Sequence, residues 1–290
     1  MSRRAILAAL IVVCGAGGPA AAQPLSIYDI QYTADPAGNS AQNGNLVDCL
    51  GGVVTHKSNE TMPRLYLQDP AHPDGWGAIM VRDWTYGFVS AVSVGDWVSL
   101  TNVLVEEYRG NTILNYDAAN NPGYVIESPG HAVPAPLEVA MDQIAAPTEG
   151  PADFWLVADH DAEPYEGMWL TVSDVVVTAM DLGKADDDYN LRGQAGDVWA
   201  SDYLNVDADY LYHPDVSVGQ HFDSVTGILE QYTRFRDTSG WDYYQLLTTS
   251  SADLVVPDPS TIALLNAGLV VLGLGRAWRR GRRGRRASRP

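Results

Sequence analysis

Apolar and polar residues alternate in short runs along most of this chain. The runs cover residues 47–55, 64–69, 77–82, 98–105 and 111–116, and clusters of Gly, Pro, Asn and Asp separate them. Short alternating runs bounded by turn residues are typical of β-strands. No long helical period appears before the C-terminal tail. The pattern therefore predicts an all-β fold, either a barrel or a sandwich.

The same pattern occurs twice. The block Val-Ser-Val-Gly at residues 92–95 recurs at 216–219, and residues 104–108 recur in similar form at 228–232, both at an offset of 124. Residues 51–55 have a counterpart within residues 173–178, at an offset of 123. A nearly constant offset of this length indicates a duplicated domain rather than a solenoid.

Each copy places a glycine turn before a long strand, and a hairpin follows near residues 109–111 and 238–240. Five-stranded OB barrels are built in this way. We therefore predict two tandem OB-like β-barrels over residues 23–128 and 164–256. A Pro- and Ala-rich linker over residues 129–163, with one short helix near residues 137–144, is expected to join them.

The N-terminus predicts export. Arg3 and Arg4 precede an apolar run at residues 5–13, and three alanines at 20–22 suit a signal peptidase. We expect a signal helix and peptide over residues 1–22, with an uncleaved anchor as the alternative. Removal of this segment would leave Cys49, which lies in an apolar run and is expected to be buried.

The C-terminus has three parts in a fixed order. Pro257, Asp258 and Pro259 come first, an apolar stretch covers residues 262–274, and eight arginines lie within the final 15 residues. Basic residues stay on the cytoplasmic side of a membrane, so the body would be held outside. With a snorkelling Arg276, residues 262–278 give a marginal transmembrane helix.

This order of parts resembles the PEP-CTERM sorting signal of Gram-negative bacteria over residues 257–290, although Asp258 stands where the family usually has Glu. The resemblance implies recognition by an exosortase near Pro257, Asp258 and Pro259. It also implies transport through the inner membrane, anchoring there, and transfer to the cell surface or matrix. A plain C-terminal tail anchor is the alternative.

The body also resembles a known module. Its first unit is similar to the OB-fold region of secreted bacterial nucleases of the endonuclease/exonuclease/phosphatase type, and the second unit follows the companion pattern. The resemblance rests on residues 27–31, 52–55, 66–70, 94–98, 106–108, 165–168 and 172–178. In that family a catalytic domain follows the OB pair, whereas here the sorting signal follows directly. We therefore expect a non-enzymatic protein with no catalytic residues.

Charge restricts the ligands that such a body can hold. Eight basic and 35 acidic residues lie between positions 23 and 256, which gives this part a net charge of −27. Such a surface repels phosphate backbones, whose binding depends on Lys and Arg. Nucleic acid is therefore not the expected partner.

Metal and cofactor binding are not expected either. Six scattered histidines lack the spacing of a metal site. The acids at 159, 161, 186–188, 207 and 209 offer oxygen ligands for calcium, but they are better interpreted as solvated loop residues. Calcium binding remains the alternative.

Aromatic residues gather in the second unit. Those on or near expected strands include Trp199, Tyr203, Tyr232, Trp241 and Tyr243. On an OB face such rings stack on bases or sugars, but they also form core and cross-strand pairs. We expect a surface- or matrix-associated, non-catalytic module that binds exopolysaccharide through this face. A nucleic-acid-binding accessory of an extracellular nuclease is the alternative.

Overall fold

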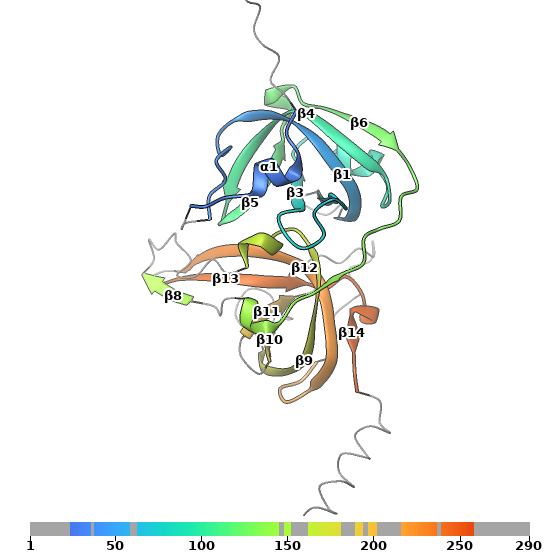
Figure 1. The fold of residues 1–290 in the computed structure, drawn as a ribbon. Coiled ribbons are helices and arrows are strands. Elements are labelled where there is room, and N and C mark those ends of the chain that lie inside the picture. Colours follow the sequence, from blue (N-terminus) through green and yellow to red (C-terminus); the bar gives the residue numbers. More distant parts are fainter. Residues whose placement is uncertain are drawn as a thin grey trace, which may run out of the picture.

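The fold is described from a computed structural model that places residues 24–35, 38–58, 63–144, 148–151, 162–180, 189–193, 197–201, 216–236 and 239–257. Figure 1 shows two β-barrels, with the chain completing the first before it enters the second. The all-β prediction of two tandem OB-like barrels is confirmed by the strand connectivity of each unit.

The first barrel closes on itself. Its strands are paired in the order β1-β2-β3-β5-β4, and β4 pairs back onto β1; β3 and β5 are parallel and the other pairs of this ring are antiparallel. This is the connectivity of a five-stranded OB barrel. The elements are α1 (Ile27–Gln31), β1 (Leu46–Ser58), β2 (Arg64–Gln68), β3 (Ala78–Asp83), α2 (Phe88–Ala91), β4 (Trp97–Tyr108), β5 (Asn111–Tyr116), the 3₁₀ helix η1 (Ala118–Asn120) and β6 (Gly123–Ser128).

The second barrel repeats that connectivity. Here the order is β9-β10-β11-β13-β12, with β12 paired back onto β9 and with β11 parallel to β13. The elements are β7 (Leu137–Glu138), η2 (Met141–Gln143), β8 (Thr148–Pro151), η3 (Glu163–Tyr165), β9 (Trp169–Met180), β10 (Tyr189–Arg192), β11 (Asp197–Ser201), β12 (His221–Arg236), β13 (Ser239–Leu247), η4 (Ser251–Asp253) and β14 (Leu254–Val255).

The duplicated sequence blocks form equivalent turns. Gly95 and Gly219 have φ angles of 90° and 89°, a left-handed conformation that glycine adopts without steric cost. Their amides donate to the carbonyls of Val54 and Val177, at 2.9 and 2.8 Å. The offset of these acceptors is 123, as in the sequence repeat. The repeat is thus a repeat of structure.

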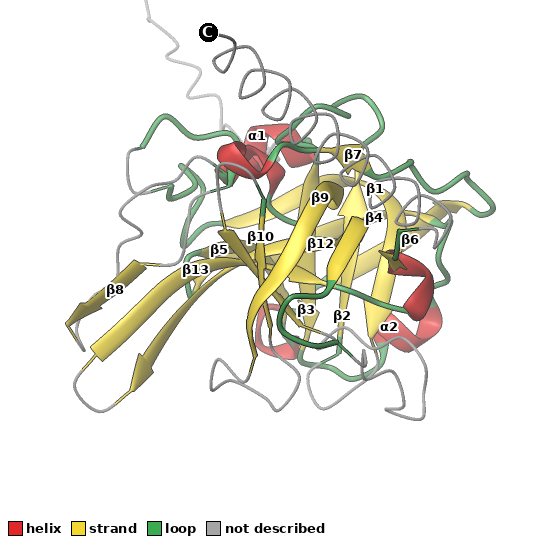
Figure 2. Cartoon of the chain, turned by 90° about the horizontal axis from the view of Figure 1, so that it is seen from below, coloured by secondary structure: helices red, strands yellow, loops and turns green. Residues whose placement is uncertain are grey.

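Part of the expected linker belongs to the second barrel. β7 pairs with β9, and β8 pairs with β13 (Figure 2). Val139, Met141 and Ile144 are buried in the core of that barrel. Their apolar side chains are removed from water there, which explains why a Pro- and Ala-rich segment is fixed on the sheet. The short helix expected near residues 137–144 is the 3₁₀ helix η2.

Each barrel has its own apolar core. Leu67, Val81 and Leu100 contribute to the first, and Leu170, Val225 and Phe222 to the second. Cys49 is buried in the first core, as expected, and burial raises the pKa of its thiol to about 12.

Within the described ranges, no helix is long and apolar enough to span a membrane. The expected signal peptide at residues 1–22, Asp258 and Pro259 of the sorting motif, and the expected span at 262–278 lie outside the described residues.

Candidate ligand-binding surfaces

The two barrels meet along a buried apolar contact, which we call the seam. Tyr66, Met80 and Ile113 of the first barrel pack there against Ile228 and Leu247 of the second. OB barrels usually bind ligands on the face formed by their second and third strands. In the first barrel this face is made by β2 and β3, and the seam covers part of it.

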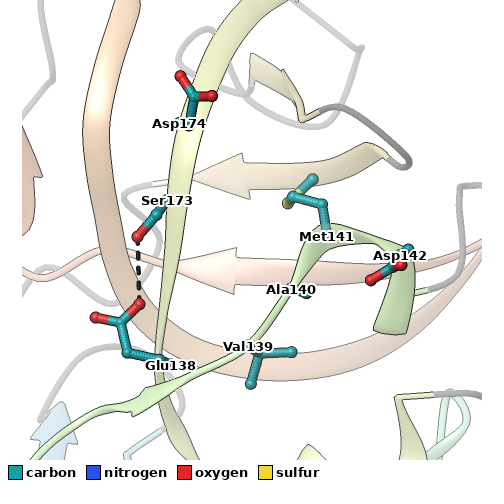
Figure 3. A pocket seen from close by; sticks show the side chains of 7 residues that line it. All are labelled: Glu138, Val139, Ala140, Met141, Asp142, Ser173 and Asp174. Atoms are coloured by element: carbon teal, nitrogen blue, oxygen red, sulfur yellow. Dashed lines mark hydrogen bonds between the residues drawn. The ribbon is translucent and has the colours of Figure 1, made fainter.

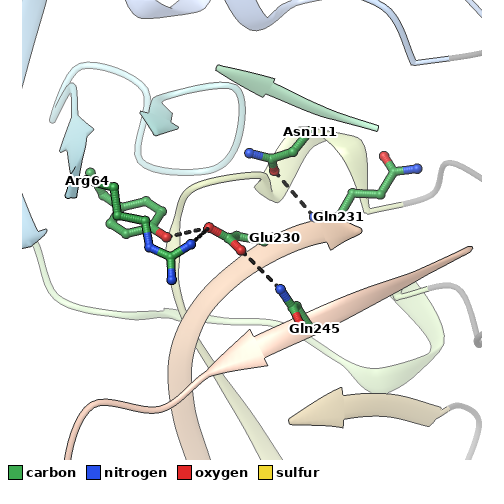
Figure 4. A network of polar contacts seen from close by, with 6 residues as sticks. Arg64, Asn111, Glu230, Gln231 and Gln245 are labelled. Carbon is green, nitrogen blue, oxygen red and sulfur yellow. Dashed lines mark hydrogen bonds and ion pairs between the residues drawn. The ribbon is translucent and has the colours of Figure 1, made fainter. Parts of the chain in front are cut away.

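A buried glutamate from the second barrel organises the polar contacts of the seam (Figure 4). Glu230 on β12 accepts hydrogen bonds from the hydroxyl of Tyr66 and from Nε2 of Gln245, the latter at 3.0 Å. A guanidinium nitrogen of Arg64 lies 3.6 Å from the same carboxylate. A buried charge needs such partners to offset its desolvation. Glu230 is therefore fixed in the closed seam.

A run of arginine and aromatic side chains crosses from one barrel to the other. The guanidinium carbon of Arg82 lies 4.4 Å from the ring centroid of Trp84 and 4.1 Å from that of Tyr108. The guanidinium carbon of Arg109 lies 5.9 Å from the ring of Tyr108 and 5.6 Å from the ring of Tyr232. These are cation–π distances. We call this set the Arg–aromatic run.

The electrostatics of the run are visible at Tyr108. Burial raises the pKa of its phenol, but hydrogen bonds and charge from Arg82 and Arg109 outweigh burial, so the pKa is lowered. Trp84 is 41% exposed, whereas Arg82 is buried. The run therefore presents an indole to solvent above a buried positive charge.

The structure places the aromatic residues expected to form a ligand face in different settings. Tyr232 is half-buried and faces Tyr243 across β12 and β13, with ring centroids 5.9 Å apart, whereas Tyr243 is buried. The register pairs Trp199 with Gln245 and Trp241 with Arg234, but their side chains are outside the described set, as is all of Tyr203. Of the five, Tyr232 alone has a described side chain that is partly accessible.

A second surface lies on β1, β4 and β6 of the first barrel. An open hollow of about 510 Å³ is lined there by Pro24, Asp48, Cys49, Leu50, Trp97, Ser99, Leu100, Thr101 and Glu127. The indole nitrogen of Trp97 donates to the carbonyl of Leu50 at 3.3 Å, which fixes the ring. The hydroxyl of Ser99 donates to Glu127 at 2.6 Å. We call this the Trp97 hollow.

The sequence interpretation did not single out the Trp97 hollow. Trp97 is 47 residues away from its partner Leu50, and only the pairing of β1 with β4 joins them. In the sequence, the only available signal was a tryptophan directly before the apolar run at residues 98–105.

A smaller hollow of about 430 Å³ lies against β7, η2 and β9 (Figure 3). Its acids include Glu138, which accepts a hydrogen bond from Ser173 at 3.2 Å, and Asp174, which lies 2.8 Å from His221. Among the described residues, no group of three or more His, Cys, Asp or Glu side chains is arranged to hold a metal ion. The acids considered for calcium, at 159, 161, 186–188, 207 and 209, are outside the described ranges.

Comparison with known proteins gives no family. No family model matches the chain, and no curated protein matches its sequence. Among solved structures, fission yeast Pot1 with ssDNA aligns at 10% identity and a TM-score of 0.32, covering 76% of this chain and 85% of that one. A replication protein A heterotrimer bound to ssDNA aligns at 7% identity and a TM-score of 0.25, covering 87% of this chain and 73% of that one. Because both TM-scores are low, the fold assignment rests on the strand connectivity described above.

Proposed function

We propose that the chain is an exported, non-catalytic OB-fold protein that binds an extracellular polysaccharide, with the Trp97 hollow as its contact site. The observation that carries this proposal is the composition of that hollow. An indole and the side chain of Leu50 lie beside the carboxylates of Asp48 and Glu127 and the hydroxyls of Ser99 and Thr101.

Sugars suit such a lining. The C–H face of a pyranose packs on an aromatic ring, and its hydroxyls donate to carboxylates in charge-assisted hydrogen bonds. The described residues that line the hollow include no Lys or Arg, so phosphate would find no counter-charge among them. A neutral, hydroxyl-rich polymer therefore fits this surface better than a nucleic acid.

The chemistry of the hollow favours binding over catalysis. The thiol of Cys49 in the lining is buried and has a pKa raised to about 12, so it is not a thiolate nucleophile at neutral pH. The carboxylate of Asp48 accepts the backbone amide of Asn102 at 2.9 Å, and Glu127 accepts from Ser99. Both acids thus have positioning partners.

Export is supported by the sequence at both ends of the chain. The signal-like segment at residues 1–22 and the basic tail would bring the body to the outer side of a membrane. Replacing Pro257, Asp258 and Pro259 with alanines, followed by cell fractionation, tests the sorting step. Unchanged processing and location would leave a plain tail anchor in its place.

A second candidate function is supported by a different surface. The Arg–aromatic run alternates guanidinium groups with rings, as surfaces that stack on single-stranded nucleic acid do. Its few cations must act against a strongly acidic body, so this binding would weaken steeply with salt. We rank it below the polysaccharide.

One experiment separates the two functions. The full chain and its Trp97→Ala and Arg109→Ala variants are applied to a glycan array and to single-stranded DNA at two salt concentrations. We expect glycan affinity to fall about fivefold or more for Trp97→Ala and to remain for Arg109→Ala, because a stacked ring contributes roughly 1–3 kcal/mol. Salt-sensitive DNA retention lost only in Arg109→Ala, with no glycan bound, would replace the first function by the second. Thermal unfolding of each variant shows that it is folded.

A further inference from the structure

Three glutamates from different parts of the chain converge at the seam. Glu107 lies on β4, whereas Glu163 and Glu166 lie on and directly after η3. Oε1 of Glu107 accepts the hydroxyl of Thr112 at 2.9 Å, and Oε2 of Glu166 accepts the amide of the same threonine at 3.1 Å. One residue of the first barrel thus joins carboxyl groups of both barrels.

The second barrel closes the other side of this cluster. The hydroxyl of Tyr244 on β13 donates to Oε1 of Glu163 at 3.0 Å. The backbone amide of Gln231 on β12 donates to Oδ1 of Asn111 at 3.3 Å. The carboxyl groups are therefore part of the contact between the barrels.

Glu166 is the most enclosed of the three. Its side chain is 2% exposed, and among the described residues its Oε1 has no hydrogen-bonding partner. A buried, unpartnered carboxylate oxygen is costly when ionised, because charge is lost from water without compensation. A proton on this carboxyl removes that cost.

The charged groups around the cluster are mostly acids. Glu230 faces it from β12 but is already held by Arg64 and Tyr66 of β2 and by Gln245 of β13. Asp35 lies near Glu107, whose Oε1 also accepts the amide of Ser40 at 2.7 Å. Arg109, beyond β4, stacks on Tyr108 and Tyr232, and His56 of β1 packs against Trp169 of β9.

We propose that the seam is a proton-controlled clasp, closed by protons held on Glu107 and Glu166 beside Glu163 and loosened when rising pH removes them. Deprotonation places like charges together in a region of low dielectric, where their repulsion is strong. The barrels then separate at the face that also carries the apolar seam.

The direction of the pH effect follows from the carboxyl groups themselves. Burial, with the nearby Glu163 and Glu107, raises the pKa of Glu166 well above its usual range. Burial raises the pKa of Glu107 to about 7, against hydrogen bonds from Ser40 and Thr112. The stabilisation is complete below the pKa of a free glutamate, about 4.3, and is lost as pH rises through about 7 and beyond.

Opening would change what the protein can bind. The covered face of β2 and β3 carries Arg64, Tyr66 and Arg82, which include two of the few cations of the body. When the seam loosens, water would take the place of the Glu230 carboxylate as the partner of Arg64 and Tyr66. The clasp therefore governs access to the usual ligand face of the first OB barrel.

Hydrogen exchange on the full chain tests the clasp, with rates corrected for the intrinsic effect of pH. The amides of Thr112 and Gln231 report on the seam. The amides of Gly95 and Gly219, which donate within their own barrels, report on the barrels themselves. Between pH 6 and pH 8.5 we expect protection of the seam amides to fall at least tenfold while the turn amides keep theirs.

Variants connect the effect to the carboxyl groups. Glu166→Gln and Glu107→Gln imitate the protonated side chains, so each should flatten the pH dependence at the seam. Glu138→Gln changes an exposed glutamate of the second barrel and should leave the dependence as in the parent chain. Seam protection that is constant from pH 6 to 8.5, or a Glu166→Gln variant that keeps the full pH dependence, would overturn the proposal. If a variant loses protection at the turn amides, the pH dependence of the parent chain still decides.

Discussion

The two barrels share their connectivity and their turns, yet their outer faces have different environments. Ile228 on β12 is fully buried in the seam, whereas Leu104, its counterpart on β4 at the offset of 124, is half-buried. Glu107 has the neutral counterpart Gln231. A duplicated scaffold has thus kept its backbone and changed the side chains where its two copies meet.

The difference shows how a repeat becomes asymmetric without losing its fold. The geometry shared by the two copies lies at positions where the turn requires one backbone conformation, such as the left-handed turns at Gly95 and Gly219. The positions that differ face outward from each barrel, where a side chain is constrained only by the residues that pack against it. Exchanging residues between the copies therefore tests which positions belong to the scaffold and which to the seam.

The largest effect is expected at the bend of β1. Gly51 has a φ of 74°, and a Cβ there would lie 1.6 Å from the carbonyl oxygen of Val98. Its counterpart in the second barrel is Asp174, with a φ of 55°. Copying that residue, as Gly51→Asp, should lower the free energy of unfolding by roughly 3–5 kcal/mol, because backbone must move to admit the side chain. Urea unfolding measures the loss.

The reverse exchange is the matched control. Asp174→Gly relieves a left-handed non-glycine residue but removes the contact of Asp174 with His221. We expect its net effect to lie within about 1 kcal/mol. A loss for Gly51→Asp that is also within about 1 kcal/mol would show that the bend of β1 tolerates a side chain and that the comparison is wrong at this position.

A smaller effect is expected from the seam packing. Ile228→Ala should lower stability by about 2–4 kcal/mol, because it leaves a cavity among Tyr66, Ile113 and Leu247. Leu104→Ala removes a similar volume at the half-buried counterpart and should lower stability by about 1 kcal/mol. Thermal unfolding of both variants compares them. Similar shifts would mean that the seam adds little to the burial of Ile228.

Much of this architecture could be predicted from local pattern. The run at residues 111–116 matches β5, and the run at 64–69 ends one residue beyond β2, because alternation and turn residues mark such strands directly. The expected strand at 47–55 ends before the last residues of β1, since His56, Lys57 and Ser58 interrupt the apolar pattern while the backbone still pairs with β2. Val139 and Met141 were assigned to a linker because a Pro-rich context hides residues that only the folded barrel buries.

The candidate surfaces were less accessible to sequence reasoning. Tyr232 was identified from its position on an expected strand, but its approach to Arg109 depends on the docking of two barrels. Leu50 and Trp97 meet only through the register of β1 and β4. Glu166 has no local signal, since a glutamate in a loop is ordinarily exposed. Contacts between separate elements require the three-dimensional arrangement.

The smallest effect is a difference between the two barrels in how their stability responds to pH below 7. Burial lowers the pKa of His56 on β1 to about 4, although Asp253 of η4 opposes this shift. Its counterpart on β9, at the offset of 123, is Ala179, which does not titrate.

A histidine whose pKa is lowered by folding stays neutral in the folded protein over a wider pH range than in the unfolded chain. The contribution of neutral His56 to stability is therefore complete above the pKa of an unfolded histidine, about 6.5, and it is lost as pH falls toward about 4. Between pH 7 and pH 5 we expect a loss of about 2 kcal/mol from this residue. Relative to its stability at pH 7, a His56→Gln variant should therefore be more stable at pH 5 than the parent chain by about this amount, while His131→Gln, at an exposed histidine, should keep the parent difference. If His56→Gln changes in stability between pH 5 and pH 7 by the same amount as the parent chain, the burial of His56 against Trp169 does not control its protonation.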